Sequence, residues 1–250
     1  MKNETLELLK KSSPLLVASL DGDDLAFLLE EARSERADIV EIRLDIWGNF
    51  FRDEMLEKMS RFKNKVGIPM LVSFRGGHPF PAWWQPVHWR ALSQAALIDV
   101  EWNPKYPWRE ILQNVKKLGL GLMISHHDYQ ATPSAKALTT LARAAYAKGA
   151  DIVKIATRAT TEADVRTLLE VNASFAPKKL MTVMGMGPLG TLSRLAAPLF
   201  HSCLVYGYIG TPTANGQAPY RELQDRIRTL YPRYDPGLQA RQMIQVGAKL

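Results

Sequence analysis

The sequence predicts an α/β protein, a single-domain TIM (β/α)8 barrel, and three observations support this prediction. Eight short apolar runs recur about every two to three dozen residues, which is the period of a strand–helix unit. Segments with helical periodicity separate these runs. The length of 250 residues suits one barrel. We expect one domain over residues 1–250, with a closing loop at about 211–217 and a C-terminal tail at about 232–250.

The elements follow from the same periodicity. The expected strands are Leu15–Leu20, Asp38–Asp45, Met70–Arg75, Leu97–Trp102, Leu120–His127, Asp151–Thr157, Leu180–Gly185 and Cys203–Ile209. The expected helices are Asp24–Arg33, Glu54–Phe62, Pro86–Ala96, Trp108–Leu118, Pro133–Lys148, Thr161–Ser174, Pro188–Phe200 and Pro219–Leu230. Thr132 with Pro133 and Thr161 are typical helix starts, and Gly119 and Gly149 are typical helix ends.

A doubly wound open sheet is the competing fold. Its support is the segment 185–190, which matches the G-x-G-x-x-G pattern of dinucleotide-binding turns. The match falls in the seventh unit, contains Pro188, and is not followed by an acidic residue about 20 positions on. We therefore interpret these glycines as a tight strand-to-helix loop.

Composition and charge limit the class of protein. The hydrophobic fraction of 46% and charged fraction of 23% are ordinary for a globular chain, and no apolar stretch is long enough to cross a membrane. Residues 1–7 do not resemble a secretory signal, and the single Cys203 excludes an internal disulfide, so we expect a cytoplasmic protein. The net charge of +7 is dispersed, without a long basic run or regularly spaced aromatic residues, so it does not argue for a nucleic-acid surface. A small anionic substrate is an equally good use of the positive potential, and we expect neither nucleic acid nor membrane as a partner.

Lys154 is the most informative single residue, because it interrupts the apolar run 151–157. A buried ammonium must be paired, solvated or neutral, and a neutral amine is a nucleophile towards carbonyl groups. Taken alone, the lysine is more simply explained as structural, with its head at the strand end or on a core carboxylate.

The polar residues of the other strands favour a functional role for Lys154. Alternate residues of a strand point to opposite faces, so each of five successive strands places polar groups on one face. These groups are Glu41, Arg43 and Asp45, then Ser73 and Arg75, then Asp99 and Glu101, then Ser125 and His127, and finally Lys154. Charges are rarely buried without a partner or a function, so we expect a polar site at the C-terminal ends of the strands.

His126 and His127 also allow a metal hypothesis, but adjacent strand residues point apart and no zinc-ligand spacing occurs. We therefore expect no metal, and we interpret His127 beside Lys154 as an acid–base group. Arg194 follows the glycine loop, near the start of the expected helix Pro188–Phe200, where an anion would bind. The loop 211–217, with Thr213 and Gln217, has the composition of a segment that closes over a substrate.

Taken together, these residues resemble the type I 3-dehydroquinate dehydratase family of the shikimate pathway, from about Leu15 to Gln217. The resemblance rests on the segments 41–45, 73–75, 99–101, 125–128 with 132–133, 151–156, 186–194 and 214–217. It implies a lyase that uses no cofactor, with Lys154 forming an imine with the substrate ketone and His127 moving the protons. It also implies a homodimer.

The resemblance further implies a role for each remaining residue. Glu41, Arg43 and Arg75 would hold ring hydroxyls, and Arg194 would bind the carboxylate. Thr213 and Gln217 would come from the closing loop. Asp99 would orient His127, and Glu101 would lie near Lys154.

The sequence departs from the family pattern at several points. The family has a glutamate shortly after the arginine at Arg75, but here residues 76–84 carry no carboxylate, and His78 is a candidate substitute. Thr213 and Asn215 replace a serine and a proline. We expect the N-terminal segment that plugs the barrel base in bacterial relatives to be missing. The role of Trp83, Trp84 and Trp89 is open.

Two other functions compete. A Schiff-base aldolase of the same fold would share the lysine without needing Arg194 and Gln217. A non-catalytic binding descendant would be consistent with the missing glutamate and the basic charge.

Overall fold

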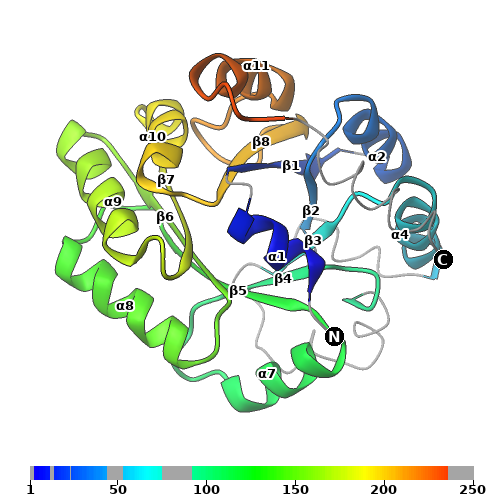
Figure 1. Cartoon of the computed structure of the whole chain (residues 1–250), viewed down its shortest axis with the longest axis horizontal. Helices are drawn as coiled ribbons and strands as arrows, with labels where there is room; N and C mark the ends of the chain where they lie inside the picture. Colours follow the sequence, from blue (N-terminus) through cyan, green and yellow to red (C-terminus); the bar gives the residue numbers. More distant parts are fainter. Residues whose placement is uncertain (1–2, 12–13, 23, 44–52, 75–91, 236–250) are drawn as a thin grey trace.

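The computed structural model describes residues 3–11, 14–22, 24–43, 53–74 and 92–235. Eight parallel strands form one sheet in the order β7-β6-β5-β4-β3-β2-β1-β8. A parallel bridge between Met181 and Ser202 brings the two edge strands together, so the sheet is a nearly closed barrel. Helices surround the ring of strands (Figure 1). The predicted TIM barrel is confirmed.

All eight expected strands are present. They are β1 Leu15–Asp21, β2 Ile39–Arg43, β3 Met70–Phe74, β4 Leu97–Glu101, β5 Gly121–Asp128, β6 Ile152–Arg158, β7 Leu180–Met186 and β8 Leu204–Gly210. The helices are α1 Glu4–Lys11, α2 Leu25–Ser34, α4 Asp53–Val66, α7 Trp108–Lys117, α8 Ala135–Ala147, α9 Glu162–Phe175, α10 Gly190–Ala196, the 3₁₀ helix η1 Ala197–Phe200, and α11 Tyr220–Leu230. Residues 86–91 of one expected helix lie outside the described residues.

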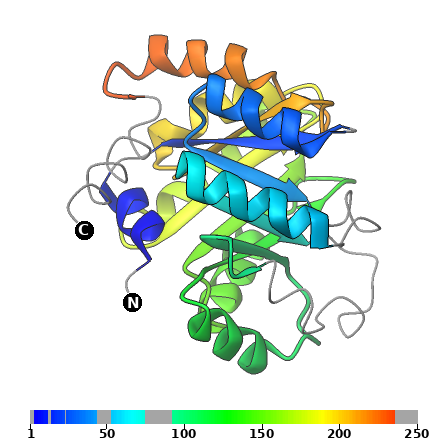
Figure 2. The same cartoon turned by 90° about the vertical axis from the view of Figure 1, so that its right-hand side faces the viewer.

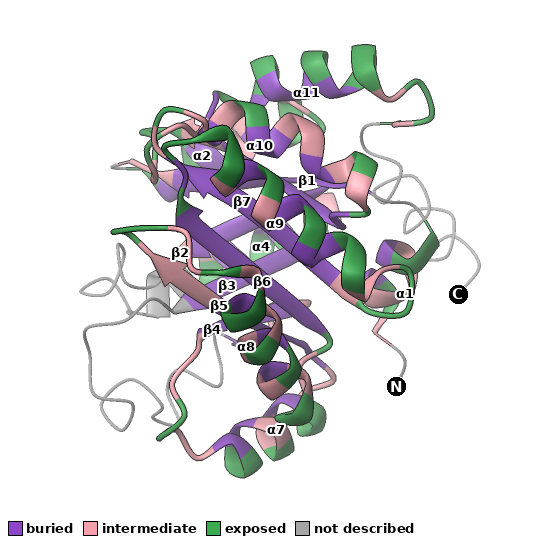
Figure 3. Cartoon of the chain, turned by 90° about the vertical axis from the view of Figure 1, so that its left-hand side faces the viewer, coloured by how far each residue is buried: buried purple, intermediate pink, exposed green. Residues whose placement is uncertain are grey.

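Apolar residues fill two separate regions. One lies between the helices and the outer faces of the strands, and the other fills the barrel interior. Inward residues such as Ile39, Leu97 and Ile152 are completely buried. Figure 3 shows the consequence: the strands are buried along most of their length, whereas the helices expose their outer faces. Burial on both faces explains why the strands read as nearly continuous apolar runs.

The expectation that no segment plugs the barrel base is wrong. Helix α1 lies near the centre of the ring in Figure 1 and at one end of the barrel in Figure 2. Leu9 packs into the interior cluster, and Asn3 donates to the carbonyls of Ala96 and Gly119, which precede β4 and β5. Leu6 and Leu8 also pack against this cluster, so the three leucines give the short helix an apolar inner face.

Helix starts were predicted with mixed success. Thr161 caps α9 in a capping box with Asp164, as expected. The expected start at Thr132 and Pro133 is wrong, because Ser134 caps α8. The Thr132 hydroxyl instead contacts the Thr157 hydroxyl at 2.8 Å and donates to the carbonyl of Arg158, so it joins the loop after β5 to the end of β6.

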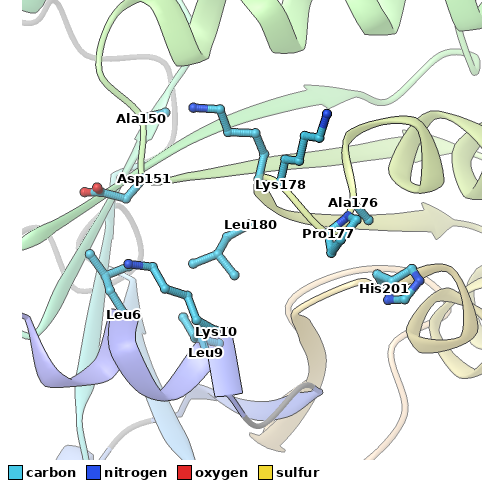
Figure 4. Close-up of a pocket in the computed structure, with 11 residues that line it drawn as sticks. Leu6, Leu9, Lys10, Ala150, Asp151, Ala176, Pro177, Lys178, Leu180 and His201 are labelled. Carbon is cyan, nitrogen blue, oxygen red and sulfur yellow. The ribbon is translucent and has the colours of Figure 1, made fainter.

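A pocket of about 490 Å³ lies at the base of the barrel, between α1 and the segments that lead into β6 and β7. Figure 4 shows Leu6 and Lys10 of α1 on one side of it and Asp151 and Lys178 on the other. These residues precede the strands, so the pocket lies at the opposite end from the predicted site.

The last described residues are held against the barrel. The Tyr231 hydroxyl donates to the carbonyl of Leu195, and the Tyr234 hydroxyl donates to Asp38. Burial raises the pKa of Tyr234 well above its ordinary range, so this phenol stays a donor at neutral pH. The expected tail therefore begins as a packed segment, and residues 236–250 lie outside the described residues. Among the described helices, none is long and apolar enough to cross a membrane.

Candidate active site

Lys154 is one of four side chains that form a layer inside the barrel, each from an alternate strand. Glu41 of β2, Asp99 of β4, Lys154 of β6 and Tyr206 of β8 all point into the barrel and are 0 to 2% exposed. The ammonium is 3.0 Å from Asp99 Oδ2 and 3.6 Å from Glu41 Oε1, and 4.3 Å from the Tyr206 ring centroid. Layers of four inward side chains are a property of the fold. In this protein one such layer surrounds a lysine.

Hydroxyl groups from the odd-numbered strands fix the carboxylate of Glu41. Ser19 of β1 and Ser73 of β3 each donate to one Glu41 oxygen at 2.5 Å. Two hydrogen bonds and a nearby ammonium offset the cost of burying this carboxylate. Asp99 has a different environment, because its Oδ1 has no hydrogen-bond partner among the described residues. That buried oxygen can accept a hydrogen bond from a bound ligand.

His127 forms a second pair with Glu101. The Nδ1 atom is 2.5 Å from Glu101 Oε2, and the His127 backbone N–H donates to Glu101 Oε1 at 2.8 Å. Ser125 donates to the same carboxylate at 3.3 Å. The Glu101 carboxylate accepts a hydrogen bond from Nδ1–H of His127. It therefore favours the imidazole tautomer in which Nε2 carries the free lone pair.

The roles implied for Asp99 and Glu101 are therefore exchanged. Asp99 contacts Lys154, and Glu101 contacts His127. Strand register explains the exchange. Glu101 pairs with Ser125, two residues before His127, whereas Asp99 pairs with Met123 further from the mouth. The carboxylate nearer the C-terminal end of β4 is the one that reaches the histidine.

The register also relates His127 to Lys154. Lys154 pairs with Ser125, and His127 pairs with Ala156 on the same two strands. His127 is therefore one inward position above the lysine, roughly 7 Å further along the strand direction. A ligand that covers the ammonium would meet the imidazole next.

Arg194 is buried, with 2% of its surface exposed, and it connects the end of β7 to the loop after β8. Its Nη1 donates to the carbonyl of Gly185 at 2.7 Å and to that of Gly216 at 3.3 Å. The residue lies in the last turn of α10, so the expected position at the helix start is wrong. Its contact with Gly216 places the guanidinium under the predicted closing loop.

The predicted closing loop, residues 211–217, is docked against Gly187 and the first turn of α10. Gly187 N–H donates to the carbonyl of Asn215, and the Thr191 hydroxyl donates to that of Gly216. A Cβ on Gly190 would lie 3.0 Å from the Gly216 Cα, so only glycine allows this close approach. The glycines at 185–190 therefore serve loop packing rather than dinucleotide binding.

Arg43, Thr213 and Gln217 meet at the mouth of the barrel. Gln217 Oε1 accepts from the Thr213 N–H and hydroxyl, and the Arg43 guanidinium donates to the Thr213 carbonyl at 3.5 Å. A cavity of about 510 Å³ opens beside them. Its lining includes residues 212–215 of the loop, with Tyr129 and Arg158 opposite. This volume is in the range of small-molecule sites.

Several predicted residues cannot be placed. Asp45, Arg75, His78 and the three tryptophans at 83, 84 and 89 lie outside the described residues. Among the described residues, no group of three or more His, Cys, Asp or Glu side chains could hold a metal ion. His126 is adjacent to His127 on β5, and adjacent strand residues point to opposite faces, so His126 lies on the face away from Lys154.

Sequence reasoning missed Tyr206, which completes the layer around Lys154. Tyr206 belongs to an apolar run that predicts a strand, and an aromatic residue in such a run is usually interpreted as part of the hydrophobic core. The available signal was its place as the fourth residue of the expected run Cys203–Ile209, on an even-numbered strand, because Lys154 is likewise the fourth residue of Asp151–Thr157. Tyr129, which stacks on His127 with ring centroids 6.1 Å apart, was also missed because it follows the strand.

Fold and site together define a (β/α)8-barrel protein with a buried lysine below a histidine–carboxylate pair. The model of the family described as "Type I 3-dehydroquinase" matches residues 16–233, and the chain belongs to that family. Two curated relatives are named 3-dehydroquinate dehydratase. The one from Shouchella clausii is 32% identical over 90% of this chain and 94% of its own length. The one from Methanothrix thermoacetophila is 32% identical over 89% and 94%.

Solved structures agree with this assignment. The type I 3-dehydroquinate dehydratase of Clostridium difficile, solved with covalently modified comenic acid, has a TM-score of 0.77 at 25% identity. The alignment covers 90% of this chain and 95% of that one. The 3-dehydroquinate dehydratase of Geobacillus kaustophilus has a TM-score of 0.75 at 26% identity, covering 88% and 93%. The carboxyl transferase domain of Rhizobium etli pyruvate carboxylase, at 11% identity, shares the fold alone.

Proposed function

We propose that the protein eliminates water from 3-dehydroquinate, giving 3-dehydroshikimate, through an imine on Lys154. The observation that carries this proposal is a fully buried lysine held by Asp99 and Glu41, with the His127–Glu101 pair directly above it. Family membership supports the substrate, since the relatives named above are 3-dehydroquinate dehydratases of the shikimate pathway.

Imine formation requires a neutral amine. Asp99, at 3.0 Å, can accept one proton from the Lys154 ammonium. The amine then attacks the C3 carbonyl, and the carbinolamine loses its hydroxyl as water to give a cationic iminium. Glu41 and Asp99 stabilise that cation because both carboxylates already face the nitrogen.

His127 then acts twice. With Nδ1–H donated to Glu101, Nε2 removes the proton from C2, and the electron pair moves into the iminium to give an enamine. The imidazolium next donates that proton to the C1 hydroxyl as the C1–O bond breaks and water leaves. Hydrolysis consumes one water and restores the amine, so the net change is loss of one water. Glu101 supplies the carboxylate contact to the histidine.

Substrate binding belongs to the mouth of the barrel. Arg43, Arg75 and Glu41 hold the ring hydroxyls, and Arg194 binds the carboxylate, where its forked guanidinium suits two oxygens. Thr213 and Gln217 close over the substrate. The docked loop supports this arrangement, because Arg43 and Arg194 both donate to its backbone carbonyls.

The proposal includes three further points. The reaction needs no metal or organic cofactor, because the iminium is the electron sink. The protein works in a reducing cytoplasm, where its lone thiol stays reduced. It assembles as a homodimer, which sedimentation would test.

Borohydride trapping tests the central claim. Intact-mass analysis after reduction with substrate present is expected to show one covalent adduct on the wild-type protein, and on Lys178→Ala as the matched control. Lys178 lines the basal pocket at the far end of the barrel. Lys154→Ala is expected to show no adduct and no rise in absorbance from the conjugated product. An adduct that persists in Lys154→Ala would overturn the proposal.

A further inference from the structure

The ring of Tyr206 lies against the ammonium of Lys154. Its side chain comes from β8, is buried, and has its centroid 4.3 Å from Lys154 Nζ. The face of an aromatic ring carries negative potential and attracts cations within about 6 Å, most strongly where water is excluded. The nitrogen therefore has a third neighbour that stabilises positive charge, besides Asp99 and Glu41.

The barrel holds this ring in place from below. The Tyr206 hydroxyl contacts Met123 Sδ at 3.7 Å, and both residues belong to the apolar cluster of the barrel interior. One end of the ring is thus anchored among hydrocarbon, while its face turns to the lysine. The hydroxyl adds an anchor, but the attraction to the ammonium belongs to the ring.

We propose that Tyr206 is a positioning residue that acts through Lys154. Its ring holds the nitrogen between Asp99 and Glu41, and it stabilises both cationic forms, the ammonium and the iminium. This inference rests on the proposed function, because the iminium forms at this nitrogen only in an imine mechanism.

The geometry separates the ring from the other charged groups. Among the described residues, the titratable groups facing Lys154 are Glu41 from β2 and Asp99 from β4, with the His127–Glu101 pair above them. A change at position 206 leaves all four in place. An altered pH profile in a variant at this position therefore reports the aromatic face.

The test compares Tyr206→Phe with Tyr206→Leu. Phenylalanine keeps the ring, so kcat/KM is expected to stay within about twofold of wild type at every pH. Leucine removes the ring, so kcat/KM at neutral pH is expected to fall about tenfold. Its acid limb is expected to shift to lower pH, because the ammonium loses a stabilising contact. An equal loss at all pH values, or a loss in both variants, overturns the inference.

A second series keeps the shape of the side chain. Phenylalanine with one, two and three ring fluorines at position 206 weakens the negative face stepwise without a cavity. We expect log kcat/KM to fall steadily with fluorine number, while thermal unfolding stays constant. A flat series overturns the role of Tyr206 if borohydride still traps Lys154. If borohydride traps nothing in the wild type, the proposed function itself has failed.

Discussion

Two tiers of the same barrel interior differ completely in chemistry. The upper tier is the layer around Lys154. The lower tier consists of the residues two positions earlier on the same four strands, and all are 0 to 1% exposed: Ile39, Leu97, Ile152 and Leu204. One step along each strand replaces hydrocarbon with two carboxylates, an ammonium and an aromatic ring.

The comparison shows where stability and function separate. Each aliphatic side chain of the lower tier stabilises the fold by about 1.5–3 kcal/mol on burial. The upper tier contributes little to the stability of the fold, because the cost of desolvating its buried charges roughly offsets their attraction. The lower tier can therefore support a site that contributes reactivity rather than stability.

The largest effect is expected from replacing Lys154 with methionine, a side chain of similar length. We expect kcat to fall by on the order of 10⁴-fold or more. Two buried carboxylates would lose their cation, which should destabilise the fold by about 3–5 kcal/mol. Urea unfolding measures the second effect, and adding Glu41→Gln and Asp99→Asn should restore much of the lost stability. If these two substitutions destabilise the Lys154→Met protein further, the burial of unpaired carboxylates is not the cause of its lost stability.

His127→Ala should separate the two chemical roles in the site. Imine formation depends on Lys154, so borohydride should still trap the substrate on this variant. Turnover should fall by roughly 10²–10⁴-fold, because the proton carrier is missing. Single-turnover product absorbance with parallel mass analysis measures both effects. Loss of the adduct would place His127 in imine formation instead.

The lower tier should show the reverse pattern. Ile152→Ala should destabilise the fold by about 2–5 kcal/mol, and Ile152→Val by about 0.5–1.5 kcal/mol. The kcat of folded protein at low temperature should change by less than about twofold, because Ile152 contacts no reacting atom. A large drop in kcat with little loss of stability would show that the tiers are coupled.

The smallest effect concerns His126, on the outer face of β5. Burial lowers its pKa, so the unfolded chain binds a proton more readily than the folded protein. The histidine's contribution to stability is therefore present above about pH 6.5 and lost as pH falls. His126→Asn should reduce the drop in melting temperature between pH 7.5 and 5.5. An unchanged drop would assign the pH dependence to other groups.

The sequence predicts much of this molecule because burial and strand alternation are local properties. All eight strands and the inward direction of Glu41, Asp99, His127 and Lys154 follow from them. The ion-pair and hydrogen-bond partners of these side chains do not follow from the sequence. Alternation gives the face of a side chain but not its depth, which depends on the stagger between strands, so Asp99 and Glu101 were exchanged. Helix α1 was missed because its eight residues show barely two turns of periodicity.

Cys203 gives the protein a practical property. It is 1% exposed, and burial raises the pKa of its thiol to about 12, so maleimide dyes will not label it. A cysteine introduced at Ala214, beside the mouth cavity, would then be the one reactive thiol among the described residues. A fluorophore there would test whether the loop 211–217 moves during turnover, with the wild-type protein as an unlabelled blank.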